Sequence, residues 1–361
     1  MRIYLVGGAV RDELLGFSPP DRDYVVLDAS EEEFLRAYPG AKKVGRDREC
    51  VFIYRGCEYT LSSQPDIWSD LRQRDLTVNA VAQDEDGRVY ALEETWRDLR
   101  KKVLRPVHRV NFYRDPLRVY RSARMAACFP GFSPHPELHR LMREIAKEQT
   151  HSLMAPERVC SELRKSCSGS RPGRFFRLLD SCGLLTPWFR ELDPGSNSSD
   201  CRGSSFSRVE LYRACQRMDR LHGDSLRVWM GLCASLGLSG STAGHPDEAK
   251  DKAIELGKRL KMATTFLQAG KTASAWIRQA AEYDQLEPQE RVELLQHLRQ
   301  RSLEERMMAV AACVSGKPDS GLWRRDLERI SRVRLPPEKR GLGPESGRIL
   351  KRLRCRALAE E

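Results

Sequence analysis

The N-terminal part of the chain alternates short apolar runs with stretches of helical character. The apolar runs, several of which repeat with a period of two, cover residues 3–6, 24–27, 50–54, 58–61 and 89–92. The helical stretches between them include residues 12–15 and 31–38. Strand-like runs interleaved with helices predict a head domain built on a mixed β-sheet.

The pattern changes after about a hundred residues. From Asp115 onward, apolar positions recur every three to four residues, as at Leu117 and Tyr120, and this spacing predicts helices. Segments 194–207 and 238–245 are rich in Ser and Gly, so we expect loops between helical blocks there. The chain is therefore predicted to have an α+β fold, in which a mixed-sheet head precedes an all-helical remainder.

Length and charge narrow the class of protein. At 361 residues the chain exceeds one ordinary hydrophobic core, so two or more domains are expected. A formal net charge of +11, with Lys and Arg spread along the chain, favours a polyanionic partner. The chain has no long apolar segment and begins on a predicted strand rather than a signal peptide, so we expect a cytoplasmic protein without a membrane partner. Eleven cysteines without CxxC spacing and seven scattered histidines are typical of reduced thiols rather than of a zinc site.

A glycine pair and two aspartates mark the start of the chain. Gly7 and Gly8 follow the first predicted strand, where they permit a tight turn that brings backbone N–H groups close to a phosphate. Asp21 and Asp23 are two positions apart on the next strand, so both carboxylates point to one side and can share a hard cation such as Mg²⁺. Each motif alone is also typical of a solvated loop. Their combination indicates metal-assisted nucleotidyl transfer.

Residues 71–80 form the second candidate motif, which is predicted to begin a helix with Asp75 or Thr77 as its cap. Arg74 suits triphosphate oxygens, while Asp75 and Asn79, four apart on one helical face, suit a ribose. The alternative is an ordinary capped amphipathic helix.

A third motif is expected to open the first long helix, with Pro116 in its first turn. Asp115 and Arg118 are three apart and face the same direction. A carboxylate acceptor beside guanidinium donors matches the hydrogen-bonding edge of cytosine or adenine, whereas guanine and uracil present the reverse pattern. An intrahelical ion pair at a capped N-terminus is the alternative.

Together these motifs resemble a known family. Gly-Gly-x-Val-Arg-Asp with Asp-x-Asp, then Arg-Asp-Leu-Thr-Val-Asn-Ala at residues 74–80, then Asp-Pro-Leu-Arg-Val-x-Arg-x-x-Arg at residues 115–124, resemble the class II tRNA nucleotidyltransferases and the related bacterial poly(A) polymerases. Further similarity lies at residues 155–159 and in a tail motif at residues 343–350. The resemblance is dense over about the first 185 residues.

The resemblance implies a seahorse-shaped enzyme with a catalytic head at residues 1–105, a neck at 106–185, a body at 186–300 and a tail at 301–361. Such enzymes join CMP or AMP to the 3′ end of tRNA and release pyrophosphate. The implied substrates are therefore CTP and tRNA, with ATP as the alternative nucleotide. No phosphatase or phosphodiesterase activity is expected, because the middle of the chain lacks the His-Asp pair that several relatives carry as a metal-dependent phosphohydrolase domain.

The family motifs also imply roles for individual residues. Asp21 and Asp23 would be catalytic and would hold two Mg²⁺ ions. The residues implied to bind the nucleotide are Gly7, Gly8, Arg11, Asp12, Arg74, Asp75, Asn79, Asp115, Arg118, Arg121 and Arg124. Basic residues of the helical part that are expected to contact tRNA phosphates are Lys165, Arg171, Arg174, Lys351 and Arg352.

Three departures from the family pattern bear on specificity. Members that complete the whole CCA end carry a long flexible loop where only residues 62–70 stand here, so a CC-adding enzyme that leaves the final A to a partner enzyme is expected. Arg114 replaces the usual Glu before the base-reading pair, and Ala91 and Thr95 replace the usual Asp and Gly of the element between head and neck. We expect the last change to stiffen that hinge. A-adding or full CCA-adding activity, poly(A) polymerase activity and a non-catalytic RNA-binding relative are the alternatives.

Overall fold

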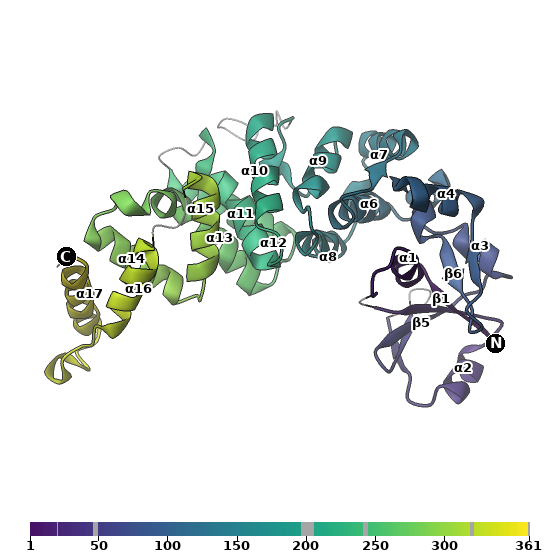
Figure 1. The fold of residues 1–361 in the computed structure, drawn as a ribbon, viewed down its shortest axis with the longest axis horizontal. Coiled ribbons are helices and arrows are strands. Elements are labelled where there is room, and N and C mark those ends of the chain that lie inside the picture. Colours follow the sequence, from purple (N-terminus) through teal and green to yellow (C-terminus); the bar gives the residue numbers. More distant parts are fainter. Residues whose placement is uncertain (20, 46–49, 196–205, 241–244, 318–320, 360–361) are drawn as a thin grey trace. The chain divides into compact units, whose positions relative to one another are not determined.

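The computed structural model describes the chain except for residues 20, 46–49, 196–205, 241–244, 318–320 and 360–361 (Figure 1). It separates into two compact units, Met1–Met154 and Ala155–Glu361. The finer division into head, neck, body and tail stays a prediction.

Unit 1 contains a seven-stranded sheet with the order β3-β4-β5-β2-β1-β6-β7 (Figure 1). The strands are β1 (Arg2–Val6), β2 (Asp23–Leu27), β3 (Lys42–Val44), β4 (Val51–Tyr54), β5 (Cys57–Leu61), β6 (Val81–Gln83) and β7 (Val89–Ala91). Strands β2 and β5 pair in parallel, and the remaining neighbours pair antiparallel. The predicted mixed sheet is therefore confirmed, although the sequence pattern did not predict β3 and β6.

The alternation of side chains along the strands creates a core on each face of the sheet. On one face, Val6 and Leu27 pack with Ile67 and Leu71 of α3 (Ile67–Leu71). On the other face, α2 (Glu31–Ala37) contributes Phe34, and α1 (Gly8–Leu14) contributes Ala9 and Val10. Helices thus cover both faces and hold the strand ends in fixed positions.

The remainder of unit 1 is mainly helical but not wholly so. Its helices are α4 (Glu93–Lys101), α5 (Arg109–Arg114), α6 (Arg118–Cys128) and α7 (Pro136–Glu148). Strand β8 (Val103–Leu104) pairs in parallel with β9 (Ser133–Pro134). The prediction of an all-helical chain after Asp115 is therefore wrong at β9, where the backbone of Ser133 donates to the carbonyl of Lys102 at 2.8 Å. A two-residue strand formed by a distant partner leaves no periodic pattern in the sequence.

The helix predicted to begin within residues 71–80 is also absent. Helix α3 ends at Leu71, a 3₁₀ turn η2 (Thr77–Asn79) follows, and the chain then enters β6. Leu76 forms a β-bridge with Pro106, and the amide of Thr77 donates to the carbonyl of Arg105 at 2.9 Å. These long-range backbone bonds replace the helical ones.

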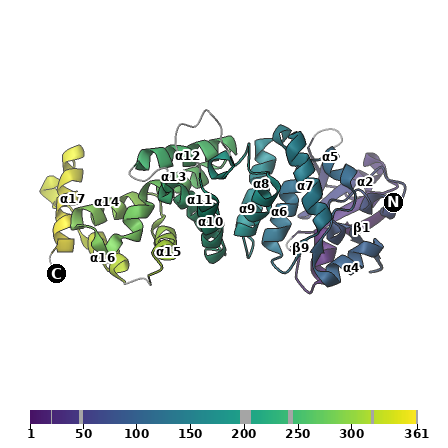
Figure 2. The same cartoon turned by 90° about the horizontal axis from the view of Figure 1, so that it is seen from above.

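Unit 2 is formed by helices (Figures 1 and 2). They are α8 (Pro156–Cys167), α9 (Gly173–Cys182), α10 (Arg208–Arg220), α11 (Ser225–Leu238), α12 (Pro246–Arg259), α13 (Thr264–Ala281), α14 (Pro288–Arg299), α15 (Glu304–Ser315), α16 (Leu322–Arg332) and α17 (Pro344–Ala359). Buried α11 lies against α13 so closely that a Cβ on Gly237 would sit 2.1 Å from the carbonyl oxygen of Ser274. Together with the sheet of unit 1, these helices confirm the predicted α+β class.

Most of the two predicted loops, 196–205 and 241–244, lies outside the described residues. Pro194 and Gly195, at the start of the first loop, form a turn. In the part of the chain that the structure describes, no helix is long and apolar enough to cross a bilayer.

Candidate active site

The glycine turn and the two aspartates lie at one end of the sheet. Strands β1 and β2 are antiparallel with Leu5 opposite Tyr24, so the end of β1 lies beside the start of β2. Gly7 follows β1 with φ +66° and ψ −122°, a conformation that only glycine adopts readily, and α1 begins at the next residue. This register brings the Gly7 turn, which follows β1, to the end of the sheet at which β2 begins with Asp23.

Asp21 and Asp23 are both exposed. Asp23 is the first residue of β2, whereas Asp21, which was predicted to lie on the same strand, precedes it. Across the parallel pair, Asp23 is in register with Glu58 of β5, so both residues face the same side of the sheet. Sequence reasoning missed Glu58, although an acidic residue near the start of a strand was a signal available to it. Among the described residues no three His, Cys, Asp or Glu side chains converge as a metal site. Mg²⁺ in proteins is commonly coordinated by one or two carboxylates, and the rest of its coordination sphere is filled by water and substrate phosphate oxygens.

Arg11 on α1 connects the glycine turn to the motif at residues 74–80. Its Nε and Nη2 donate to Oδ1 of Asp12 at 2.9 and 2.7 Å, and its Nη1 donates to Oδ1 of Asn79 at 2.5 Å. The guanidinium also lies 4.4 Å from the ring centroid of Phe129. Burial lowers the pKa of Arg11, and the carboxylate of Asp12 opposes that shift. Arg11 therefore orients neighbouring polar groups rather than projecting into solvent.

Asp75 is the centre of the same network. Its Oδ1 accepts from the amide of Leu76 at 2.8 Å and from Nδ2 of Asn79 at 3.0 Å, and its Oδ2 accepts from Nε of Arg121 at 2.8 Å. Burial alone raises the pKa of this carboxyl, but Arg121 and the hydrogen bonds from Asn79 and Leu76 outweigh it and hold the pKa well below its usual value. Asp75 and Asn79 do meet as predicted, although across a 3₁₀ turn rather than along a helix.

The predicted base-reading pair lies at the junction of α5 and α6. Asp115 directly follows α5, and Arg118 is the first residue of α6, so Asp115 and Pro116 precede the helix in which they were predicted to lie. The amide of Arg118 donates to the carbonyl of Asp115 at 3.1 Å, and Nη1 of Arg118 donates to the carbonyl of Gln73 at 2.6 Å. Burial lowers the pKa of Arg118, while Asp75 and Asp115 oppose the shift.

The other predicted nucleotide-binding arginines surround this pair. Arg74 donates from Nε and Nη2 to Oδ2 of Asp70 at 3.0 and 2.6 Å. Arg121 and Arg124 follow Arg118 at intervals of three along α6, so the three guanidinium groups lie along one side of the helix. The structure thus gathers the predicted nucleotide-binding residues within unit 1, and it adds Asp70 as a positioning residue for Arg74.

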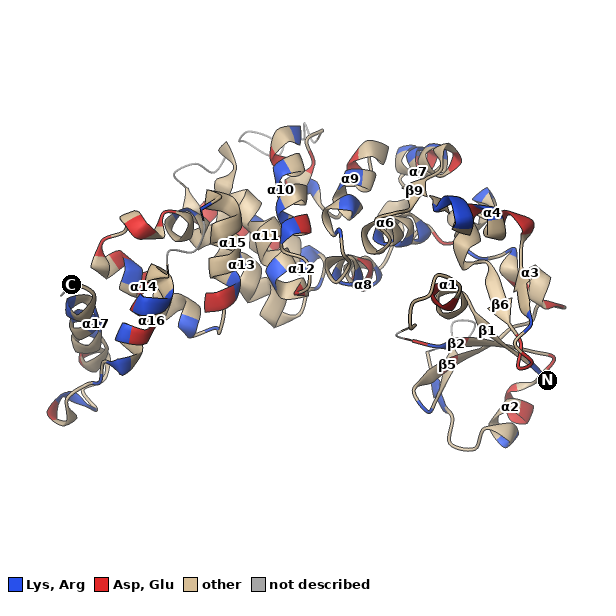
Figure 3. Cartoon of the chain, viewed as in Figure 1, with Lys and Arg blue, Asp and Glu red and all other residues tan. Residues whose placement is uncertain are grey.

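The basic residues predicted to contact RNA fall into two groups in unit 2. Lys165 is on α8, Arg171 lies in the connection to α9, and Arg174 is in the first turn of α9. Lys351 and Arg352 are on α17, at the other end of the unit (Figures 1 and 3). Burial and the nearby charge of Arg177 lower the pKa of Arg174. The structure therefore does not bring the five residues into one cluster.

The α17 group lines an open pocket. Arg348, Lys351, Arg352 and Arg356 contribute to a pocket of about 520 Å³ together with Gln289 of α14. Nζ of Lys351 pairs with Oε2 of Glu293 at 3.2 Å.

Known proteins match both the sequence and the fold. A family described as "Probable RNA and SrmB-binding site of polymerase A" matches residues 131–195. A "CCA-adding enzyme" of Coxiella burnetii is 36% identical over 211 residues, covering 53% of this chain and 55% of that protein. A "Multifunctional CCA protein" of Tolumonas auensis is 35% identical over 307 residues, covering 73% of this chain and 71% of its own length.

The chain belongs to the class II tRNA nucleotidyltransferase and poly(A) polymerase family. It spans about half the length of several of the curated relatives that it matches. The Thermotoga maritima CCA-adding enzyme, solved with tRNA, shares the fold with a TM-score of 0.70 at 19% identity, covering 100% of this chain and 88% of that one.

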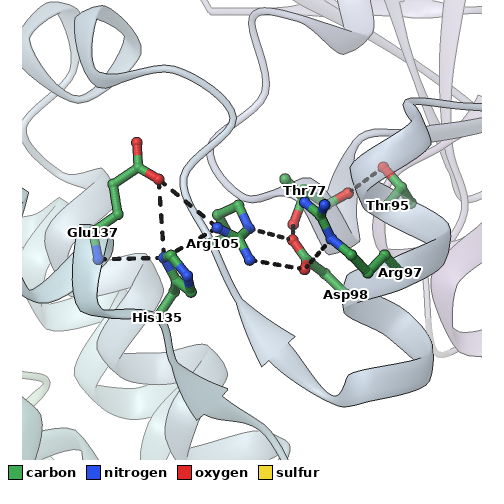
Figure 4. Close-up of polar contacts among 7 residues, drawn as sticks. All are labelled: Thr77, Thr95, Arg97, Asp98, Arg105, His135 and Glu137. Carbon is green, nitrogen blue, oxygen red and sulfur yellow. Dashed lines mark hydrogen bonds and ion pairs between the residues drawn. The ribbon is translucent and has the colours of Figure 1, made fainter.

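In this family member, a buried polar network occupies the element that joins the sheet to the helices behind it (Figure 4). Asp98 accepts from Oγ1 of Thr77 at 2.8 Å and from Nε of Arg105 at 2.9 Å. Nη1 of Arg105 lies 3.2 Å from Nδ1 of His135, whose pKa is lowered by burial and by Arg105. Thr95, which stands where the family usually has Gly, donates to the carbonyls of Thr77 and Ala80 at 2.8 and 3.2 Å. The departure at residue 95 therefore adds a bond between α4 and η2.

Proposed function

We propose that this chain is a template-independent tRNA nucleotidyltransferase that adds two cytidines from CTP to the tRNA 3′ end and releases pyrophosphate. The observation that carries the CC specificity is the connection between β5 and α3. Five residues, 62–66, join these elements, where the family members that complete the CCA end have a long flexible loop. A connection this short contains no flexible segment that could reorient Asp115 and Arg118 from CTP binding to ATP binding.

Asp115 and Arg118 supply the base preference in this proposal. The Gln73 carbonyl fixes one nitrogen of the Arg118 guanidinium, which leaves its other N–H groups to donate to the N3 and O2 acceptors of cytosine. The Asp115 carboxylate would accept from the N4 amino group. A guanine or uracil would leave these groups without matching partners, at a cost of about 1–3 kcal/mol for each.

Asp21 and Asp23 fit the binding of two Mg²⁺ ions, because both are exposed carboxylates, Asp23 as the first residue of β2 and Asp21 two positions before it. When bound, such ions lower the pKa of the attacking 3′-hydroxyl and neutralise the departing pyrophosphate. The remaining residues bind and orient: the Gly7 turn admits the triphosphate, and Arg74, fixed by Asp70, is directed at its oxygens. The tRNA 3′ oxygen then forms its bond to the α-phosphorus as the bond to pyrophosphate breaks.

The basic helices of unit 2 are proposed to carry the acceptor stem through phosphate contacts. The pocket beside α17 and the exposed Arg171 are the strongest candidates for these contacts. In this proposal a separate A-adding enzyme completes the CCA end of the tRNA. Cytidine addition takes place in the cytoplasm.

The proposal is tested with a tRNA that ends at the discriminator base, supplied with CTP alone, ATP alone, or both. Sequencing of the product ends is expected to show two added cytidines with CTP and no further extension when ATP is also present. An added adenosine after the two cytidines would overturn CC specificity and favour full CCA addition, the activity for which the Coxiella burnetii relative is named. Adenosine tracts with ATP alone would indicate a poly(A) polymerase.

A non-catalytic RNA-binding relative is the alternative from a different class. Replacement of both Asp21 and Asp23 by Ala separates the two, because it removes the metal donors without touching the basic helices. Loss of incorporation with unchanged tRNA affinity supports the enzyme, whereas a wild-type chain that binds tRNA but incorporates neither nucleotide supports the binding protein.

A further inference from the structure

Unit 1 has a second pocket, distinct from the candidate active site. Its volume is about 730 Å³, within the range of pockets that hold small ligands. Its walls come from the end of α3, from α4, and from the segment that runs through β8 into α5. None of the predicted nucleotide-binding residues lines it.

The wall of this pocket carries excess positive charge. Four of its fourteen lining residues are arginines and two are glutamates. The arginines are Arg72, Arg97, Arg105 and Arg114. Figure 4 shows two of them, Arg97 and Arg105, on either side of Asp98, together with the lining residues Thr77 and Glu137. Guanidinium groups bind phosphate oxygens through paired hydrogen bonds, and here they come from separate elements to line one cavity.

Arg114 has fewer intramolecular interactions than Arg97 and Arg105 of the same wall. Its side chain is exposed, and among the described residues it has no hydrogen bond or ion pair. Arg105, by contrast, is held by Asp98, and Arg97 lies 3.6 Å from the same carboxylate. A guanidinium on the wall of a concave site, without an intramolecular anion, is available to an external one.

The floor of the pocket is partly apolar. Pro106 is buried, and Leu92 and Val107 are half-buried beneath the charged rim. Apolar walls with a few convergent charged groups are typical of sites that take a ring system bearing a charged chain. This combination matches a nucleoside polyphosphate better than a single inorganic phosphate.

We propose that this pocket is a second binding site for a polyphosphate, either the phosphate chain of a free nucleotide or pyrophosphate. Arg114, Arg97 and Arg72 contact the phosphate oxygens, and the apolar floor takes the base when one is present. The site does not depend on the proposed catalytic activity.

The pocket also lies directly behind the segment that holds the base-reading arginine. Gln73 is among the residues that line the pocket, and its backbone carbonyl accepts from Nη1 of Arg118. Asn111, also in the wall, donates to the carbonyls of Arg72 and Arg74 at 2.8 and 2.9 Å. A ligand in the pocket therefore contacts the same backbone that positions Arg74 and Arg118 on the other side.

The test measures binding stoichiometry by equilibrium dialysis on the full chain with ATP, CTP and pyrophosphate as separate probes. The pocket variant is Arg97→Ala combined with Arg114→Ala. The matched control is Arg100→Ala combined with Arg109→Ala, which removes the same charge from the same two helices outside the pocket. Arg114→Glu alone is a second variant that leaves the Asp98 network intact, and Arg109→Glu is its control.

The wild type and both controls are expected to bind one more polyphosphate per chain than the pocket variants, in which this site weakens at least about tenfold. A stoichiometry that is the same in all five proteins overturns the site. Nucleotide binding with no pyrophosphate binding assigns the source to nucleotides, and equal binding of all three probes assigns it to the phosphate chain. If the candidate active site binds no nucleotide, the wild type would bind one polyphosphate per chain and the pocket variants none. Failure of the proposed function is therefore distinguishable from failure of the pocket proposal.

Discussion

Oδ2 of Asp75 lies 2.8 Å from Nε of Arg121, which ties the segment before β6 to helix α6. The two residues are 46 positions apart in the sequence. The remaining oxygen of Asp75 is occupied by Leu76 and Asn79, so the carboxylate organises the candidate site from within. Both carboxylate oxygens of Asp75 thus accept hydrogen bonds from the protein itself.

Asp75→Asn is expected to lower the free energy of unfolding by about 1.5–3 kcal/mol at pH 7, because a charge-assisted hydrogen bond in a buried site is lost. The folded-state pKa of Asp75 lies below the unfolded value of about 3.9, so its contribution is complete above that pH and is lost as the pH falls through the folded value. Thermal unfolding of both proteins from pH 7 down to pH 3 measures this. A difference that stays constant below pH 4 would contradict the charged state of Asp75.

The Asp75 site illustrates what the sequence pattern could and could not predict. The spacing of Asp75 and Asn79 correctly indicated that they meet, but the helix invoked for it was wrong. The backbone of Leu76 and Thr77 instead pairs with Arg105 and Pro106, about thirty residues away. Such non-local pairing overrides local propensity and leaves no periodic signal.

The strands show the same limit. Five strands, β1, β2, β4, β5 and β7, were predictable. In each, apolar and polar residues alternate or several consecutive residues are apolar. Strand β6 has three residues and follows a turn, so its place between β1 and β7 depends on pairing that a local pattern does not carry. Glu58 was missed for a related reason, since its position beside Asp23 exists only once β2 and β5 pair.

The Thr95 hydroxyl is expected to stabilise the junction between α4 and η2. Thr95→Val keeps the side-chain shape but removes the donor to the carbonyls of Thr77 and Ala80, so unfolding should become easier by about 0.5–1.5 kcal/mol. Thr95→Ser retains the hydroxyl and is the control. Chemical denaturation of the three proteins measures the effect, and equal stability of Val and Ser variants would show that the bond contributes nothing.

Gly7→Ala is expected to reduce both stability and nucleotide incorporation. The positive φ costs about 1–3 kcal/mol with a side chain, and relief of this strain would shift the turn beside Arg74, whose Nη1 lies at an ordinary contact distance of 3.6 Å from the new Cβ. Gly16 also has a positive φ, +81°, but a Cβ there would meet nothing within 4 Å. Gly16→Ala should therefore lose stability with little change in incorporation once the protein is folded. Parallel losses of activity in both variants would remove the special role of the Gly7 turn.

Asp21→Asn and Asp23→Asn, tested separately, are expected to lower cytidine incorporation by about 100-fold or more, because each removes a donor for the proposed Mg²⁺ ions. Both residues are exposed, so the free energy of unfolding should change by less than about 0.5 kcal/mol. Affinity for tRNA should be unchanged, since the substitutions leave every basic residue in place. Asp28→Asn is the matched control, an exposed aspartate just beyond the other end of β2 that pairs with Arg2 at 2.6 Å. Its incorporation rate should equal that of the wild type. Near-normal rates in both test variants at saturating Mg²⁺ would place the catalytic carboxylates elsewhere in the chain.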